Sequence, residues 1–293
     1  MDEITVFTPT YNRAYCLVRL YESLINQTVK NFIWLIIDDG SADNTPELVD
    51  KWKEDGLIQI VYIYQKNQGM HAAHNTAYAN ITTEFNVCID SDDFMPINAI
   101  EIILDSIESI RDNKEYAGIV GLDADLSQNI IGTKIPDHLL RVRLSDLYLK
   151  YKVKGDKKLV YKTDIVRKYP QYPIFDGEKF VPLGYLYQLI DQHFYLKPVN
   201  EILCIVEYLS DGSTKNILYQ YRKNPRGFAF SRLHRIQLSH GLKDKFKNLI
   251  HLVSSCIFAN DYSHLSKIKN KILLLLAFPL GLILNIYIRV NTK

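Results

Sequence analysis

The first part of the chain repeats one pattern four times: a short apolar segment, then a polar cluster, then a helical pattern. The apolar segments are residues 4–7, 32–37, 58–64 and 85–89. Continuous apolar strands that alternate with helices are typical of a mainly parallel β-sheet covered by helices on both faces. Such a sheet binds its ligand at the carboxyl ends of its strands. We therefore predict an α/β fold whose polar clusters meet at one edge of the sheet.

The pattern weakens after Pro96. We expect a helix to about Arg111, an apolar segment at 117–122 and a less regular region to about residue 172. A loop with two acids then occupies 174–182, followed by an aromatic-rich helix or strand at 185–194 and a β-like segment at 202–208. A boundary near residue 211 divides the chain into a main domain, 1–210, and a C-terminal region, 211–293.

Composition supports a folded protein with two electrostatically different parts. The chain has 293 residues, of which 47% are hydrophobic and 23% charged, and this excludes a disordered or collagen-like protein. Residues 1–210 carry a net charge of −9, whereas residues 211–293 carry +11. The C-terminal region is therefore predicted to be a basic helical tail that binds an anionic partner, either nucleic acid or a membrane surface.

The end of this tail favours the membrane. Residues 272–288 contain no charge, and Lys267, Lys269, Lys271 and Arg289 flank them. Because a membrane-spanning helix needs about 20 apolar residues and this segment holds Pro279 and Gly281, we expect an interfacial or re-entrant segment. The alternative is a helix buried in the core. Nucleic acid is not expected as a partner.

The cysteines and the N-terminus indicate a cytoplasmic protein. Cys16, Cys88, Cys204 and Cys256 lie far apart and form no zinc-binding pattern, which is typical of a reduced compartment. The first residues lack the basic and apolar regions of a signal peptide.

The strongest chemical signal is the run Asp90-Ser91-Asp92-Asp93 after the fourth apolar segment. Mg²⁺ and Mn²⁺ prefer one or two protein carboxylates, with phosphate oxygens and water completing the shell. The run could also be a helix N-cap with a solvated acidic turn.

A second acidic cluster, Asp38-Asp39-Gly40-Ser41-Ala42-Asp43, could likewise be a helix cap, or it could accept hydrogen bonds from a base or a ribose. The sequence contains no G-x-G-x-x-G after the first strand and no G-x-x-x-x-G-K-[ST]. This argues against nicotinamide, flavin and P-loop chemistry.

Four motifs in order resemble glycosyltransferase family 2, especially bacterial capsule, O-antigen and wall-polymer members. They are Thr8-Pro9-Thr10-Tyr11-Asn12-Arg13, Asp38-Asp39-Gly40-Ser41-x-Asp43, Asn67-x-Gly69 with Asn75, and Asp90-Ser91-Asp92-Asp93. The resemblance is close from residue 4 to about 96. It implies a GT-A fold, a nucleotide-sugar donor, usually a UDP-sugar, and inversion at the anomeric carbon.

The resemblance also implies roles for individual residues. Thr8, Pro9, Tyr11 and Arg13 would line the uridine pocket, Asp39 would accept from uracil, and Asn67 to Gly69 would close on the nucleotide. Asp90 and Ser91 would contact the ribose or the metal. Asp92 would ligate Mn²⁺ or Mg²⁺, with Asp90 as its partner and Asp93 as the next choice. His74 departs from the arginine that many relatives carry there.

An inverting transferase needs a general base beside the attacking hydroxyl. The resemblance puts this acid in a loop well after the metal motif, where Glu178 is our prediction, Asp176 its close rival and Asp191 a distant one; Lys179 could pair with the base or with the diphosphate. The same loop could instead be an ordinary Asp-Gly surface turn. His71 and His74 are predicted to be substrate-side or surface residues.

We therefore expect an inverting, metal-dependent glycosyltransferase at the inner face of the cell membrane. Its acceptor would be a growing polysaccharide unit linked to a polyprenyl diphosphate. The alternative is a nucleotide-sugar binder or scaffold without a working base.

Overall fold

The computed structural model describes residues 3–207, 216–239 and 241–292. The predicted boundary at residue 211 lies outside these residues. Contacts divide the chain into two units. Unit 1 comprises residues 1–67, 73–171 and 186–208, and unit 2 comprises residues 68–72, 172–185 and 209–293.

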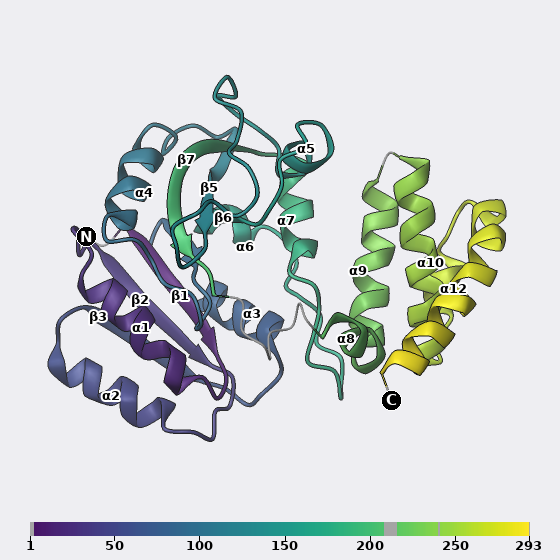
Figure 1. Cartoon of the computed structure of the whole chain (residues 1–293), viewed down its shortest axis with the longest axis horizontal. Coiled ribbons are helices and arrows are strands. Elements are labelled where there is room, and N and C mark those ends of the chain that lie inside the picture. Colours follow the sequence, from purple (N-terminus) through teal and green to yellow (C-terminus); the bar gives the residue numbers. More distant parts are fainter. Residues whose placement is uncertain (1–2, 208–215, 240, 293) are drawn as a thin grey trace. The chain divides into compact units, whose positions relative to one another are not determined.

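The described part of unit 1 contains a seven-stranded sheet with strand order β3-β2-β1-β4-β6-β5-β7 (Figure 1). The strands are β1 (Ile4–Thr10), β2 (Phe32–Asp38), β3 (Gln59–Tyr64), β4 (Phe85–Cys88), β5 (Tyr116–Ala124), β6 (Lys157–Lys162) and β7 (Tyr195–Ile205). Strands β1 to β4 are mutually parallel, β5 is parallel to β7, and β6 is antiparallel to both β4 and β5. The sheet is thus mainly parallel, as predicted.

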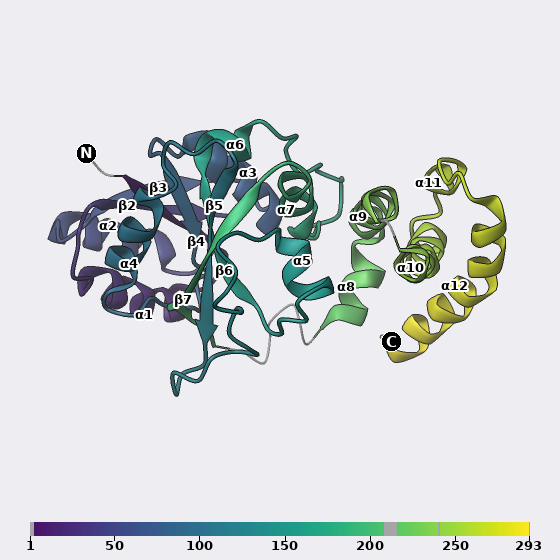
Figure 2. The ribbon, with the colours of Figure 1, turned by 90° about the horizontal axis from the view of Figure 1, so that it is seen from above.

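Helices cover both faces of this sheet (Figure 2). One face packs against α1 (Ala14–Ile25), α2 (Thr45–Asp55) and α4 (Ala99–Glu108) through a continuous apolar core. Its aromatic centre is a stack of Tyr21 on Trp52, with ring centroids 4.3 Å apart. Side chains of α3 (Met70–Asn80) and α7 (Gly184–Asp191) contact the strands on the other face, for example Tyr187 on Tyr161.

The region without a clear sequence pattern contains regular elements. Residues 144–167 form α5 (Leu144–Leu149), β6 and α6 (Thr163–Arg167). Because β6 runs antiparallel to β4, its first residues lie at the edge where β1 to β4 end. The carboxyl end of β5 lies at the same edge, because β5 is antiparallel to β6.

Unit 2 is helical over its C-terminal part. It contains α8 (Ile217–Lys223), α9 (Pro225–Leu238), α10 (Leu242–Ala259), α11 (Ser263–Ser266) and α12 (Lys271–Asn291). Leu233, Leu252, Val253 and Ala277 belong to a second apolar core that joins α9, α10 and α12. The predicted apolar segment 272–288 lies within α12, which continues through Pro279.

Candidate functional site

The loops after β1 and β2 form one hydrogen-bonded unit. The Asn12 backbone N–H donates to Ser41 Oγ at 2.9 Å, and the Ala42 N–H donates to Asn12 Oδ1 at 2.7 Å. The Asp39 N–H donates to the Thr10 carbonyl at 2.8 Å. Asn12 adopts the left-handed conformation, at φ 52°, which asparagine tolerates better than most residues. Two of the four predicted motifs are therefore in direct contact.

The two acids of the second motif have different surroundings. Asp38 is fully buried and accepts hydrogen bonds from the Tyr62 hydroxyl at 2.6 Å and the Ser41 N–H at 2.7 Å. It therefore supports the loop. Asp39 accepts from Gln65 Nε2 at 2.7 Å, so Gln65, which the sequence did not single out, orients the carboxylate predicted to meet the base.

Gly40 brings the third motif to the same place. It has φ 86°, and a Cβ built on it would lie 2.8 Å from the backbone nitrogen of Asn67. Only glycine fits this approach without a shift of the backbone. The Asp39 loop and Asn67 are thus adjacent.

Two buried polar atoms in this region have no hydrogen-bond partner among the described residues. They are Thr10 Oγ1 and Asn67 Oδ1. Because an unpaired buried polar atom costs about 1–3 kcal/mol, such atoms point to a ligand that pairs with them. Thr10 and Asn67 belong to the first and third motifs, which are predicted to bind the nucleotide.

The other residues predicted for the uridine pocket are distributed as follows. Thr8 and Pro9 lie within β1, and Thr8 Oγ1 accepts a hydrogen bond from Trp34 Nε1 at 3.0 Å, which gives it a structural partner. Tyr11 is 47% exposed beyond the end of that strand. Arg13 follows, and its guanidinium Nη1 lies 3.7 Å from Asp92 Oδ2, which joins the first motif to the fourth.

The four residues of the acidic motif differ in burial and in their contacts. Asp92 is partly exposed beside Arg13, and Asp90 lies near the Cys88 thiol, with Sγ to Oδ1 at 3.7 Å. Ser91 is buried. Asp93 is also buried and accepts from the Glu207 N–H at 3.2 Å. Burial raises the pKa of Asp93 to about 7, with Asp90 and Asp92 adding to the rise and Lys158 opposing it.

These contacts fit a divalent cation held by Asp92 and Asp90. Among the described residues, no group of three or more histidine, cysteine or acidic residues is suited to a metal, so this part of the chain offers no complete cage. Mg²⁺ and Mn²⁺ bound with substrate phosphates need only one or two protein carboxylates. Asp93 is engaged by the protein, which makes it the weaker candidate.

Lys158 and Asp123 also lie at the edge of the sheet where β1 to β4 end, and the sequence did not reveal either of them. Lys158 lies at the start of β6, where its Nζ is 3.5 Å from the Cys88 carbonyl. Burial alone would lower the pKa of its ammonium group, but Cys204, Asp123, Asp93 and Asp90 raise it well above the usual range. Asp123, near the end of β5, is 3% exposed, and its Oδ1 has no partner among the described residues. The sequence signal that could have revealed Asp123 was the repeated order of an apolar strand followed by an acid.

The three candidate bases also differ. The Glu178 carboxylate is buried and accepts from the N–H groups of Arg226 and Gly227, each at 2.9 Å, and from Arg226 Nε at 3.0 Å. Asp191 is buried and accepts from the N–H groups of Leu144 and Ser145. These two acids thus satisfy the first backbone groups of α9 and α5.

Asp176 differs from both. It is exposed, and no hydrogen bond to its carboxylate is described, although its backbone carbonyl accepts from Arg226 Nη2. Of the three acids, Asp176 is the one whose carboxylate is available to a substrate.

The loop that holds these acids also approaches Gly69. Gly69 has φ 94°, and a Cβ on it would lie 1.9 Å from the Lys179 carbonyl oxygen. The Lys179 N–H donates to Asn224 Oδ1 at 2.8 Å. Glycine is therefore required at position 69, and Lys179 takes part in this contact through its backbone.

The histidines are not at the surface, contrary to one part of our prediction. His71 is 1% exposed and His74 fully buried, because α3 directs both toward the interior. Burial lowers the pKa of His71 to about 4. His74 packs edge-on against Phe7, and its Nε2 lies 3.7 Å from Cys88 Sγ.

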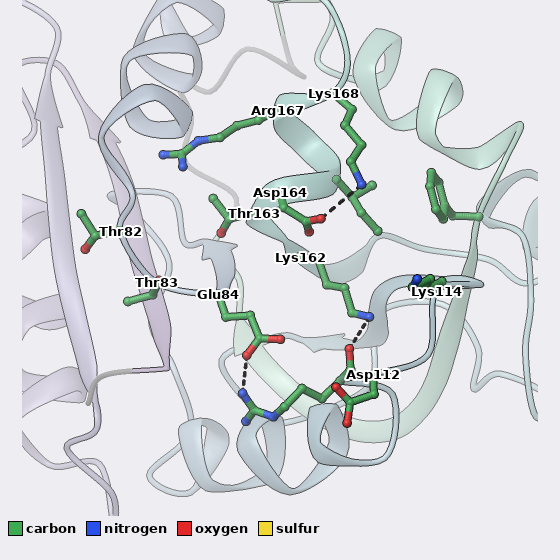
Figure 3. A pocket seen from close by; sticks show the side chains of 13 residues that line it. Thr82, Thr83, Glu84, Asp112, Lys114, Lys162, Thr163, Asp164, Arg167 and Lys168 are labelled. Atoms are coloured by element: carbon green, nitrogen blue, oxygen red, sulfur yellow. Dashed lines mark hydrogen bonds and ion pairs between the residues drawn. The ribbon is translucent and has the colours of Figure 1, made fainter.

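A pocket of about 820 Å³ lies at the other end of β4, where residues 82–84 precede the strand (Figure 3). Its cations are largely used by the fold. Lys162 donates to the carbonyls of Ile110, Arg111 and Asn113, and Arg167 donates to those of Tyr78, Ala79 and Ile81. Arg111 pairs with Glu3 and Glu84. This pocket is a poor candidate for the site.

Comparisons with known proteins agree with the resemblance. The model of the family described as Glycosyl transferase family 2 matches residues 5–155. An uncharacterized glycosyltransferase of Rickettsia felis is 40% identical over 106 residues, which are 36% of this chain and 17% of that protein. Chondroitin synthase of Escherichia coli is 34% identical over 102 residues, 35% of this chain and 15% of that protein. Each match thus covers less than a fifth of the relative.

Solved structures show the same architecture. S. aureus TarS 1–349 in complex with UDP-GlcNAc gives a TM-score of 0.62 at 15% identity, covering 94% of this chain and 79% of that chain. The mannosyltransferase PcManGT from Pyrobaculum calidifontis, in complex with GDP-Man and Mn²⁺, gives 0.58 at 15% identity, covering 99% and 83%. The predicted GT-A fold is thereby confirmed.

Proposed function

Because this chain belongs to glycosyl transferase family 2, we propose that it transfers a hexosyl or N-acetylhexosaminyl group from a UDP-sugar to a hydroxyl of a growing cell-surface glycan. The observation that carries the proposal is the junction of Arg13 with Asp92, at 3.7 Å, beside the interlocked loops after β1 and β2. This junction combines the loop predicted to bind the nucleotide with an acidic turn, at the edge where α/β sheets bind ligands.

The donor is proposed from the loop contacts. Asp39, oriented by Gln65, accepts from the base, and the unpaired oxygens Thr10 Oγ1 and Asn67 Oδ1 receive donors from the nucleotide. The UDP-GlcNAc bound to TarS supports a uridine donor, while the GDP-Man bound to PcManGT makes guanosine the competing choice.

Asp92 and Asp90 would hold Mn²⁺ or Mg²⁺. When bound, the cation stabilises the negative charge that develops on the departing diphosphate. Arg13 lies beside Asp92 and would bind the same phosphates. The protonated Lys158 keeps the neighbouring buried carboxylates compensated.

We assign the general base to Asp176. A base must be free to take the proton of the attacking hydroxyl, and the Asp176 carboxylate is exposed. Glu178 is a positioning residue, since its hydrogen bonds to Arg226 and Gly227 fix the loop that carries Asp176.

The acceptor is proposed to be a glycan linked to a polyprenyl diphosphate at the cytoplasmic face of the cell membrane. The basic C-terminal region supports this choice, because it is suited to an anionic membrane surface.

The test is release of nucleoside diphosphate from a panel of UDP-, GDP- and TDP-sugars by the purified protein with Mn²⁺. Turnover of one UDP-sugar that EDTA abolishes is the expected result. Nucleotide binding without turnover, with lipid-linked acceptors present, would instead indicate a non-catalytic nucleotide-sugar binder.

A further inference from the structure

Helix α12 has two opposite faces that are both apolar. One face, Ala277, Gly281, Asn285 and Ile288, is buried against the neighbouring helices. The other is exposed and comprises Ile272, Leu275, Leu276, Ile283, Ile286, Tyr287 and Val290, each 54% exposed or more. A helix at the surface of a soluble protein normally turns a polar face to water. The face that α12 turns to water is apolar instead.

The buried face holds α12 firmly. A Cβ on Gly281 would lie 2.5 Å from Val253 Cβ, so the helix backbone packs closely on α10. Asn285 Nδ2 donates to the Ser254 carbonyl at 3.1 Å, and Arg222 Nη1 on α8 donates to the Thr292 carbonyl at 2.7 Å. Among the described residues α12 is long and apolar enough to cross a membrane, but these contacts bind it to helices with charged surfaces.

The charged residues around the exposed apolar face of α12 indicate which kind of partner this face binds. Lys267, Lys269 and Lys271 are exposed at the N-terminal end of α12, and Arg289 is exposed at the other end. Tyr287 lies beside that end. Residues 211–293 contain no glutamate and only three aspartates. An apolar face bordered by cations and an aromatic residue suits the surface of an anionic bilayer, where cations meet head groups and apolar side chains enter the acyl region.

We propose that α12 is a membrane-docking helix that lies in the plane of an anionic phospholipid surface. Its face of Ile272, Leu275, Leu276, Ile283, Ile286, Tyr287 and Val290 enters the lipid while its other face stays on α10. This inference deepens the proposed function, because it names the surface through which the chain reaches a lipid-linked acceptor. The biological purpose of the docking rests on the proposed function, whereas the docking itself does not.

The first test is sedimentation of the full chain with vesicles of 70% phosphatidylcholine and 30% phosphatidylglycerol. The triple variant Leu275→Gln/Ile283→Gln/Ile286→Gln should bind at least tenfold more weakly. A matched control, Leu57→Gln/Leu140→Gln/Leu149→Gln, removes three exposed leucines of unit 1 and should bind like the unmodified chain. Circular dichroism checks that both variants are folded. Equal binding of the α12 variant and the control would overturn the proposal.

The second test distinguishes docking in the plane from spanning. Trp34 and Trp52 are buried, so tryptophans introduced as Leu275→Trp or Ile286→Trp can be followed by quenching with lipids brominated on the acyl chain. These positions are about 16 Å apart along the helix. Equal quenching at both, by bromine at one shallow depth, is expected. Maximal quenching at different depths would indicate a spanning helix and overturn the proposal.

A second copy of the chain is the competing partner. Light scattering that shows a dimer for the unmodified chain and a monomer for the α12 variant, without vesicle binding by either, would overturn the proposal. Release of nucleoside diphosphate by the same variants should stay unchanged. Since that assay uses no vesicles, failure of the enzymatic function and failure of membrane docking are read separately.

Discussion

Glu178 Oε1 accepts hydrogen bonds from both the backbone N–H and the Nε of Arg226, at 2.9 and 3.0 Å. Arg226 is the second residue of α9, so the carboxylate lies at the N-terminus of this helix, where negative charge is stabilised. The same guanidinium reaches back to the Asp176 carbonyl through Nη2. One ion pair therefore fixes both the start of α9 and the loop that carries the proposed base.

This arrangement predicts that substitution of Asp176 lowers activity, whereas substitution of Glu178 lowers stability. Asp176→Asn should reduce turnover at least a hundredfold, the usual contribution of a general base, with little change in thermal stability. Glu178→Gln places an amide NH₂ against backbone donors and should cost about 1–3 kcal/mol of unfolding free energy. Initial rates and urea unfolding measure the two effects, with Asp112→Asn, an exposed acid, as control. An active Asp176→Asn beside a stable, inactive Glu178→Gln would reverse the assignment.

The acidic turn gives a second prediction. Asp92→Asn should lower metal-dependent turnover at least a hundredfold, because a neutral amide binds a divalent cation poorly. Calorimetry should show weaker Mn²⁺ binding in the presence of UDP. The melting temperature of the variant should stay unchanged, because Asp92 is partly exposed. Glu54→Gln, an exposed acid on α2, is the matched control. Undiminished turnover in Asp92→Asn would contradict the metal assignment.

The contact between Gly40 and Asn67 gives a third prediction. Gly40→Ala should weaken UDP binding at least tenfold, because the new Cβ would push the Asn67 backbone away from the Asp39 loop. Gly56→Ala is a suitable comparison, since Gly56 also has a positive φ, 64°, but no atom lies within 3.4 Å of its Cβ position. Both variants carry backbone strain of about 1–3 kcal/mol, and only Gly40→Ala adds the collision. Equal UDP affinities, measured by calorimetry, would show that the contact does not shape the site.

Much of the sheet edge at the carboxyl ends of β1 to β4 could be predicted from the sequence, because the pattern that predicts it is local in the chain. Strands β1, β2 and β4 are almost entirely buried, so apolar residues dominate them, and the polar residues that follow lie at their carboxyl ends. Strand β3 lies at the edge of the sheet and is partly exposed. Strand β6 has no such signal. It contains Lys157, Lys158 and Lys162, and it pairs with β4 and β5, which are distant in the chain. Its pairing, and with it the place of Lys158, depends on long-range contacts that periodicity does not encode.

The role of Glu178 was hidden for a related reason. A sequence shows that an acid lies in a loop, but its hydrogen-bonding partners, the N–H groups of Arg226 and Gly227, are nearly fifty residues away. Whether a loop acid is a base or a helix cap depends on that tertiary contact. The resemblance to a family located the loop, and the structure distinguishes Asp176 from Glu178 within it.

Lys158 supports a fourth prediction, about stability. Lys158→Met would leave Asp93 and Asp123 buried without their cation, which should cost about 3 kcal/mol of unfolding free energy. Adding Asp123→Asn should recover part of this loss, because one uncompensated carboxylate is removed. Urea unfolding of the two variants and the unmodified chain measures the recovery. If Lys158→Met unfolds at the same urea concentration as the unmodified chain, Lys158 does not compensate these acids.

His251 on α10 gives a prediction about pH. Burial, together with the nearby cations Arg232, Lys247 and Arg235, lowers the pKa of His251 to about 4. The ring centroids of His251 and Tyr221 are 5.5 Å apart. The unfolded chain protonates this side chain near pH 6.5 and the folded chain near pH 4, so protonation favours unfolding between these values. Stability is therefore complete above about pH 6.5 and falls as the pH drops, by up to about 1.4 kcal/mol per pH unit for this group. His251→Gln should flatten the dependence of the urea midpoint on pH between 6.5 and 4.5, whereas His138→Gln, on an exposed loop, should leave it unchanged. Parallel pH profiles for the two variants would mean that His251 is protonated in the folded chain.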